Sequence, residues 1–168
     1  MSRASQPLPP QELRFVTVSR DDPRARPLLD ELAVEYAQRY VSTPPAIMAW
    51  LTAVPVAEFA PPDGGFIIGE VDEVAVTGGA FQRFDAHTAE LKRIWTDSAH
   101  RRRGLATALL VELERIIADR GYRRIYLTTG NRQPEAEALY ESAGYTRLSE
   151  PLPSRGPVFP IAFTKDLR

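Results

Sequence analysis

The sequence contains no cysteine, and this absence removes several kinds of chemistry. A chain without cysteine forms no disulfide, offers no thiolate nucleophile and builds no cysteine-ligated metal site. Its 168 residues also contain only two histidines, His87 and His100. A histidine-rich metal site is therefore not expected either, and we predict that the protein uses no metal.

Long apolar runs and strong net charge are missing as well. No run approaches the roughly 20 apolar residues that a helix needs to cross a bilayer, and residues 1–10 lack the apolar core of a signal peptide. The net charge of −1 gives no sign of nucleic-acid or membrane binding. A hydrophobic content of 43% suits a soluble globular chain. We expect a cytoplasmic protein that binds neither nucleic acid nor membrane.

Apolar spacing predicts one domain that follows a short leader. Residues 1–10 contain three prolines, so 1–12 is expected to be a mobile leader and 13–168 to form a single domain with one full core. Strand-like and helix-like apolar periods then divide the rest of the chain. The expected strands are 13–18, 66–71, 74–84, 89–96, 124–129, 145–148 and 158–164, and the expected helices are about 23–40, 44–50, 105–120 and 134–143.

This order of elements predicts an α/β or α+β fold. The second half alternates strand, helix, strand and helix, which is typical of helices packed on a sheet. We expect a mixed, twisted central sheet of about six to seven strands flanked by about four helices. A ligand site is expected at the carboxyl end of a central strand, where open α/β sheets commonly bind ligands.

The stretch Arg-Arg-Arg-Gly-Leu-Ala at 101–106 is unusual for the start of a helix. A helix N-terminus exposes unpaired N–H groups and carries partial positive charge, so a capping side chain or an acid normally stands there. Here no residue from 100 to 104 is a cap or an acid. Backbone N–H groups, a glycine and arginines together form a cradle suited to phosphate. The alternative is a solvated basic turn.

The form of this cradle points to one protein family. The phosphate-loop ending Gly-Lys-Ser/Thr and the Gly-x-Gly-x-x-Gly fingerprint are both absent, which disfavours nucleotide hydrolases and dinucleotide enzymes. The pattern Arg-x-x-Gly-x-Ala, at Arg101, Gly104 and Ala106, closely resembles that of the GNAT superfamily of acetyl-CoA-dependent N-acetyltransferases. Segment 89–96 resembles the family's central strand, and 127–145 its second motif. The resemblance covers about 74–148.

The resemblance implies a GNAT-like fold with acetyl-CoA bound between the fourth and fifth strands. The cradle amides would hold the pyrophosphate, and the pantetheine arm would pair with 89–96 as an added strand. Asn131 would touch the cofactor, although an asparagine there often makes only a turn. The implied cofactor-binding residues are Ile94, Trp95, Thr96, Arg101, Arg102, Arg103, Gly104, Leu105, Ala106, Thr107, Asn131, Ala136 and Tyr140.

Acetylation of an amine by a thioester needs a neutral amine and a proton for the leaving thiolate. The resemblance makes Tyr140 the candidate acid, and the alternative is a tyrosine buried in the core. Glu90 is the candidate base, because it stands four positions before Ile94 on one strand and should share its face. Alternatively, Glu90 orients the substrate or pairs with Arg93 or Arg83.

Three further expectations concern the substrates. A backbone N–H near Ile94 or Trp95 is expected to polarise the thioester carbonyl. Tyr36 and Tyr40 fall in a segment that forms the acceptor wall in the resembling family, with core packing as the alternative. Acidic residues near the expected entrance would suit a cationic acceptor. These residues are Glu35, Glu58 and Asp63.

We therefore predict an N-acetyltransferase in which a primary amine attacks acetyl-CoA directly, within a ternary complex. Direct transfer is the simpler scheme because no cysteine is present to form an acyl-enzyme. The acceptor is left open between a free amino acid, a polyamine, an antibiotic amine and a protein lysine. The alternative function is a non-catalytic acyl-CoA-binding or sensor module, and the resemblance also allows a homodimer.

Overall fold

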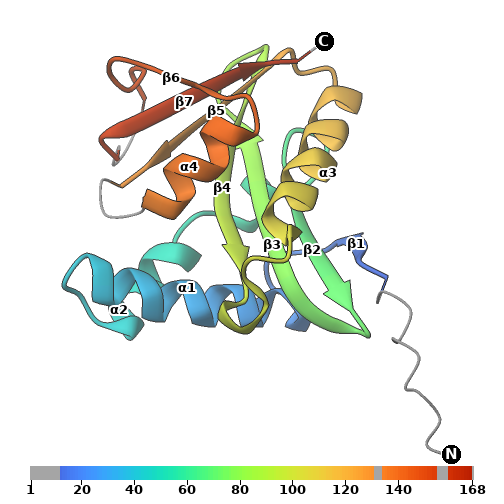
Figure 1. The fold of residues 1–168 in the computed structure, drawn as a ribbon, viewed down its shortest axis with the longest axis vertical. Coiled ribbons are helices and arrows are strands. Elements are labelled where there is room, and N and C mark those ends of the chain that lie inside the picture. The colour runs from blue at the N-terminus through green and yellow to red at the C-terminus, as the bar shows by residue number, and fades with distance from the viewer. Residues whose placement is uncertain (1–11, 131–133, 155–158, 168) are drawn as a thin grey trace, which may run out of the picture.

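Seven strands form one twisted sheet in the computed structural model, in the order β1-β2-β3-β4-β5-β7-β6 (Figure 1). The structure describes residues 12–130, 134–154 and 159–167. The predicted leader, apart from residue 12, and Asn131 lie outside these ranges. No helix in the described ranges is long and apolar enough to cross a membrane.

The observed elements follow the predicted order closely. The strands are β1 (Arg14–Thr17), β2 (Gly65–Val71), β3 (Val74–Arg83), β4 (Thr88–Thr96), β5 (Arg124–Thr129), β6 (Thr146–Arg147) and β7 (Ile161–Asp166). The helices are α1 (Arg26–Arg39), α2 (Pro44–Thr52), α3 (Leu105–Asp119) and α4 (Pro134–Ser142). Short 3-10 turns occupy Pro23–Ala25, Val56–Phe59 and Ser98–His100. The α/β class and the mixed sheet are confirmed, with the last strand starting three residues later than expected.

The centre of the sheet is split. Every neighbouring pair of strands is antiparallel except β4 and β5, which are parallel and joined through α3. These two strands pair only at their beginnings, where Thr88 to Glu90 lie opposite Arg124 to Tyr126. Beyond this point β4 and β5 diverge (Figure 1). The predicted opening between the fourth and fifth strands is therefore present.

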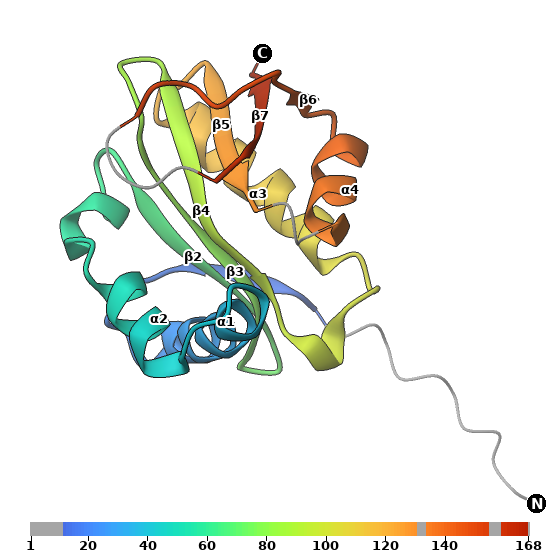
Figure 2. The same ribbon diagram turned by 90° about the vertical axis from the view of Figure 1, so that its left-hand side faces the viewer.

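Helices cover both faces of the sheet (Figure 2). On one face, α3 buries Leu109, Leu113 and Ile117 in a core that also contains Leu91 of β4. On the other face, α1 buries its apolar side in a second core that contains Trp95. Burying one large apolar side chain stabilises the fold by roughly 1.5–3 kcal/mol. Both cores therefore contact β4, one on each face, whereas the β5 residues of these cores belong to the first alone.

A β-bulge at Arg93 changes which face the end of β4 presents. The register between β3 and β4 shifts between Gly78 and Ala80, and Arg93 has a φ of 59° in the left-handed region. Leu91 and Ile94 consequently pack on the same α3 side, although three positions separate them. Glu90 and Ile94 therefore lie on opposite faces of the sheet. The predicted shared face is wrong, because the inserted residue interrupts the alternation of side chains.

Candidate active site

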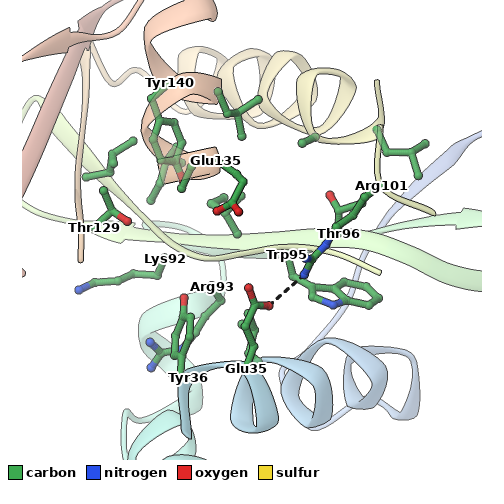
Figure 3. A pocket seen from close by; sticks show the side chains of 18 of the residues that line it. Glu35, Tyr36, Lys92, Arg93, Trp95, Thr96, Arg101, Thr129, Glu135 and Tyr140 are labelled. Atoms are coloured by element: carbon green, nitrogen blue, oxygen red, sulfur yellow. Dashed lines mark hydrogen bonds and ion pairs between the residues drawn. The ribbon is translucent and has the colours of Figure 1, made fainter. Parts of the chain in front are cut away.

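A pocket of about 500 Å³ opens where β4 and β5 part. The final residues of these two strands form its floor, and α1, α4 and the N-terminal turn of α3 surround it (Figure 3). Trp50 of α2 and Phe159 complete the lining. The pocket therefore occupies the carboxyl ends of the central strands, as the sequence predicts.

The N-terminus of α3 borders this pocket without a cap. Gly104 occupies the N-cap position with a φ of 75°, no side chain caps the helix, and the first turn contains no acid. By contrast, Thr43 caps α2 through its side chain. The next residues, Leu105, Ala106 and Thr107, all line the pocket. The predicted uncapped helix start is confirmed, and its free N–H groups suit an anion.

Open space surrounds the α-carbon of Gly104. A Cβ placed on this glycine would meet no atom within 4 Å, so the glycine is required by its positive φ and not by packing. The same open space allows a phosphate to approach the backbone closely. A glycine with positive φ and open space beside it is what the sequence pattern of a phosphate cradle predicts at this position.

The three arginines before this helix have different surroundings. Arg101 lines the pocket and donates from Nη2 to Oε2 of Glu35 at 3.1 Å (Figure 3). Arg102 also lines the pocket, whereas Arg103 is exposed and is not part of the lining. Glu35 pairs additionally with Arg39 at 3.0 Å. Glu35 is thus neutralised by two arginines.

The three acids predicted to form an acidic entrance do not form one. Glu35 lines the pocket but is already paired, and Glu58 and Asp63 do not line it. Asp63 pairs instead with Arg83 at 3.1 Å. That expectation was wrong because the sequence shows where acidic residues occur but not which arginines pair with them in the folded protein.

The β4 edge forms one long side of the pocket. Ile94, Trp95 and Thr96 all line it, as predicted. The Trp95 carbonyl is oriented toward β3, where it accepts a hydrogen bond from the Thr77 hydroxyl at 2.8 Å. On the β5 side, β4 has no strand partner beyond Glu90 in the described residues. This edge can therefore pair with an extended ligand through main-chain hydrogen bonds.

Tyr140 of α4 points into the pocket from the other side (Figure 3). Its side chain is buried and packs against the rings of Tyr145 and Phe163, each with a centroid separation of 5.7 Å. Burial, with a smaller contribution from Tyr36, raises the pKa of Tyr140 well above its usual range. The hydroxyl therefore remains neutral and protonated at neutral pH. Ala136, one helical turn earlier, also lines the pocket.

Glu90 lies outside the lining and already has two partners. Its Oε1 accepts from Nε2 of Gln82 at 3.2 Å, and its Oε2 is 3.3 Å from Nζ of Lys92. The cation paired with it is thus Lys92, which lines the pocket, and not Arg93 or Arg83. Glu90 therefore forms an ion pair, as the alternative to the base role predicted, but its partner is Lys92.

Of the two tyrosines predicted for the acceptor wall, one lines the pocket. Tyr36 lines the pocket, and burial raises its pKa to about 12. Tyr40 is outside the lining and packs on Tyr36 and Phe159, with ring centroids 6.0 and 5.9 Å away. A Cβ on Gly130 would lie 1.7 Å from the Tyr40 hydroxyl, so Tyr40 abuts the end of β5. Tyr40 supports the wall that Tyr36 presents.

Several residues of the pocket were not identified from the sequence, among them Phe159 and Arg93. Phe159 lies far along the chain, just before β7, and no local pattern connects it with α1. The sequence places Arg93 on a strand and shows its charge, but it does not predict that the side chain is buried. That burial depends on the bulge. Among the described residues, no group of three or more His, Cys, Asp or Glu is placed to hold a metal ion.

The fold is that of the GNAT-type acetyltransferases, as solved structures with TM-scores of 0.76 and 0.72 show. The chain matches the acetyltransferase (GNAT) family over residues 25–145, and it belongs to that family.

Individual relatives agree with this assignment. The chain is 38% identical over 61 residues to N-acetyltransferase 8 of Homo sapiens, a match that covers 36% of this chain and 27% of the human protein. A GNAT-family acetyltransferase of Staphylococcus aureus has a similar fold, with a TM-score of 0.76, 15% identity and coverage of 94% and 100% of the two chains. PaiA N-acetyltransferase of Thermoplasma acidophilum, solved in complex with coenzyme A, has a TM-score of 0.72 and 16% sequence identity to this chain. The match covers 93% of this chain and 99% of that one. The chain spans about a quarter of the length of the human relative.

Proposed function

We propose that this protein transfers an acetyl group from acetyl-CoA to a primary amine by direct attack within a ternary complex. One observation carries the proposal: the uncapped N-terminus of α3 and the open edge of β4 border the same pocket. The first suits a pyrophosphate, and the second suits the extended pantetheine arm. A CoA thioester combines these two chemical features in one molecule.

The cofactor would lie along the split in the sheet. Backbone N–H groups at Gly104 to Thr107 would hold the pyrophosphate, with Arg101 and Arg102 adding charge-assisted hydrogen bonds. Arg101 would then share its guanidinium between the phosphate and Glu35. The thioester would reach the pocket between β4 and Tyr140. Asn131 remains a proposed contact, outside the described residues.

The reaction exchanges one bond to the acetyl carbon for another. The amine nitrogen attacks the thioester carbonyl, and a main-chain N–H of the β4 edge near Ile94 or Trp95 would stabilise the developing oxyanion. The carbon–sulfur bond then breaks, and Tyr140 would give its proton to the leaving thiolate. The proton released by the amine restores Tyr140 through solvent.

Deprotonation of the amine would not require Glu90 in contact with it. Arg93 lines the pocket, and neighbouring positive charge lowers the pKa of an ammonium group. An amine bound near Arg93 would therefore lose its proton to water more easily. We assign Glu90 the role of orienting Lys92, which agrees with its distance of 3.3 Å from Nζ.

The test is release of free thiol from acetyl-CoA in the presence of a panel of primary amines. The proposal predicts thiol release that depends on both the enzyme and the amine, with the acetylated amine as product. A protein that binds acetyl-CoA but acetylates no amine in the panel would instead be an acyl-CoA sensor.

A further inference from the structure

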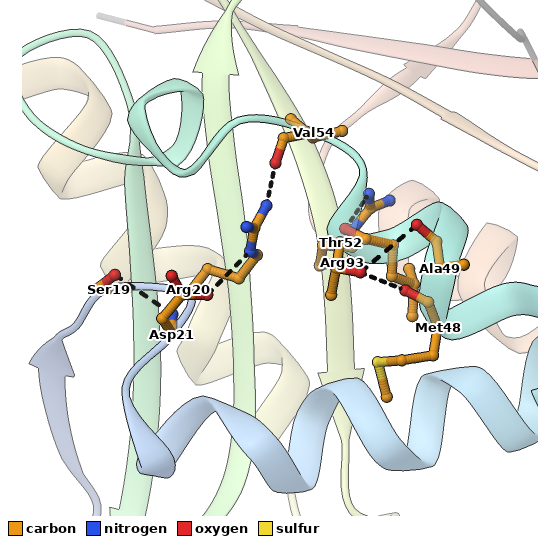
Figure 4. Close-up of polar contacts among 9 residues, drawn as sticks. Ser19, Arg20, Asp21, Met48, Ala49, Thr52, Val54 and Arg93 are labelled. Atoms are coloured by element: carbon orange, nitrogen blue, oxygen red, sulfur yellow. Dashed lines mark hydrogen bonds and ion pairs between the residues drawn. The ribbon is translucent and has the colours of Figure 1, made fainter. Parts of the chain in front are cut away.

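Arg93 is a buried cation without an acidic partner. Only 9% of its surface is exposed, and no carboxylate of the described residues forms an ion pair with it. The recorded hydrogen bond of its guanidinium runs from Nη2 to the carbonyl of Leu51 at 3.3 Å, at the end of α2 (Figure 4). Its Nε has no partner. A buried charge in this state is costly unless a ligand pairs with it.

The position of Arg93 differs from that of the other buried arginine. Arg20 also reaches a carbonyl near the end of α2, that of Val54, but it lies 3.6 Å from the carboxylate of Asp21 and does not line the pocket (Figure 4). Arg93 lines the pocket, and besides the Leu51 carbonyl its guanidinium lies against aromatic rings. Its guanidinium lies 4.9 Å from the ring centre of Trp50 and 5.8 Å from that of Phe59.

The remaining cations of the pocket are already neutralised or belong to the cofactor end. Lys92 pairs with Glu90, and Arg39 pairs with Glu35 and Glu135. The other two lining arginines are part of the cradle before α3. Arg93 is therefore the pocket cation of the acceptor side that no described carboxylate neutralises.

Aromatic side chains surround the space beside Arg93. Tyr36, Trp50 and Phe159 line the pocket, and Trp50 meets Phe159 edge to face at 6.2 Å. Such rings favour an apolar or aromatic body in the ligand. The acceptor side thus combines one unneutralised cation with an apolar wall.

We propose that the acceptor is a small amino carboxylate with an apolar or aromatic body, whose carboxylate pairs with Arg93. This inference rests on the proposed acetyl transfer and narrows its substrate class. An arginine offers several N–H donors in a planar fork, which matches a carboxylate. Polyamines lack the anionic group and would place further positive charge against Arg93. The acceptor left open by the sequence is therefore a free amino acid or a close analogue.

The first experiment compares acceptors that differ only in this group. L-phenylalanine and L-phenylalaninamide share the ring and the position of the amine, but only the first carries a carboxylate. Because the amine of the amide has the lower pKa, kcat/KM is expressed per neutral amine. With saturating acetyl-CoA, kcat/KM for the acid should exceed that for the amide about 10- to 100-fold, the range expected for a hydrogen bond to a charged group. Equal values, or a preference for the amide, would overturn the inference.

Substitutions then test whether Arg93 causes the preference for the acid over the amide. Arg93→Met keeps an unbranched side chain at the same positive φ and should bring the acid-to-amide ratio close to one. Arg93→Lys should retain part of the preference because it keeps the charge. Arg20→Met removes the buried arginine that does not line the pocket, so the ratio should stay at its wild-type value. A ratio that falls equally in the Arg20 and Arg93 variants would overturn the inference.

A binding measurement needs no variant. Hydrocinnamate should compete with the amine acceptor in the wild-type enzyme, whereas hydrocinnamamide, of the same shape, should compete at least about tenfold more weakly. Equal inhibition by the two compounds would contradict the role of Arg93.

The outcomes separate this inference from the proposed function. If acetyl-CoA is turned over with amines that lack a carboxylate as well as with those that carry one, the acetyl transfer stands and the substrate class is wrong. If no amine of either kind releases thiol, the proposed function fails first.

Discussion

Tyr140 and Glu90 were both candidates for proton transfer, and the structure gives them different surroundings. Tyr140 lines the pocket, so its hydroxyl can meet a leaving thiolate there. Glu90 lies on the opposite face of the sheet from Ile94, because of the bulge at Arg93, and its carboxylate pairs with Lys92. At the scale of single residues, therefore, the acid is better supported than the base.

Removing the Tyr140 hydroxyl should slow the chemical step. We expect Tyr140→Phe to lower kcat about 10- to 100-fold and to leave the KM for acetyl-CoA nearly unchanged, since the ring remains. Steady-state thiol release measures both constants. Tyr145→Phe is the matched control, because Tyr145 is a neighbouring buried tyrosine that bonds to Glu114 and does not line the pocket. An unchanged kcat in Tyr140→Phe would exclude its role as the acid.

Glu90→Gln should have a much smaller effect. The amide keeps the size of the carboxylate. We expect kcat/KM to fall less than about tenfold, with the shape of its pH profile preserved, because we propose that Glu90 orients Lys92 instead of acting as the base. The measurement is kcat/KM across the pH range in which the enzyme is stable. Loss of an ionisation from the profile, together with a fall of a hundredfold or more, would restore Glu90 as the base.

At the scale of elements, two interruptions create the site. The start of α3 lacks a cap, and β4 separates from β5 after three paired residues. Neither feature stabilises the unliganded fold. Both expose backbone groups to the pocket, where a ligand can pair with them.

The two ends of α3 offer a matched test of the cradle. Gly104 and Gly121 have positive φ values of 75° and 93°, and a Cβ on either meets no atom within 4 Å. Changing either to alanine should lower the free energy of unfolding by about 1 kcal/mol, the cost of the left-handed conformation. Only Gly104→Ala should also weaken acetyl-CoA binding, as measured by calorimetry. Equal affinity in both variants would show that the phosphate does not approach Gly104.

Local patterns predicted the elements well and the contacts between them poorly. Apolar spacing predicted α3 to within one residue of its end, and the missing cap was visible because capping is local. The bulge at Arg93 was invisible, because the register of β4 is set by its neighbours. The Glu35–Arg101 pair was missed for the same reason, since it joins elements 66 residues apart.

At the scale of the whole molecule, stability should depend on tyrosines buried around the pocket. The pKa of Tyr36 is raised from 10.0 to about 12 in the folded state. The unfolded chain therefore releases this proton first as the pH rises, and the stability contributed by neutral Tyr36, complete below pH 10, is lost toward pH 12.

Urea unfolding of the wild type and of Tyr36→Phe checks this dependence. Between about pH 8 and about pH 11, the wild type should lose roughly 1 kcal/mol more free energy of unfolding than Tyr36→Phe. Equal losses in the two proteins would mean that Tyr36 ionises with an ordinary pKa.

The most direct test of the account is a thermal-shift titration with acetyl-CoA, with ATP as a second phosphate-bearing ligand. At about a hundredfold excess over the dissociation constant, binding adds roughly 2.7 kcal/mol of stability. For a domain of this size, Tm should rise by about 5–11 °C with acetyl-CoA and much less with ATP. A folded protein whose Tm does not respond to acetyl-CoA would contradict the assignment of this pocket.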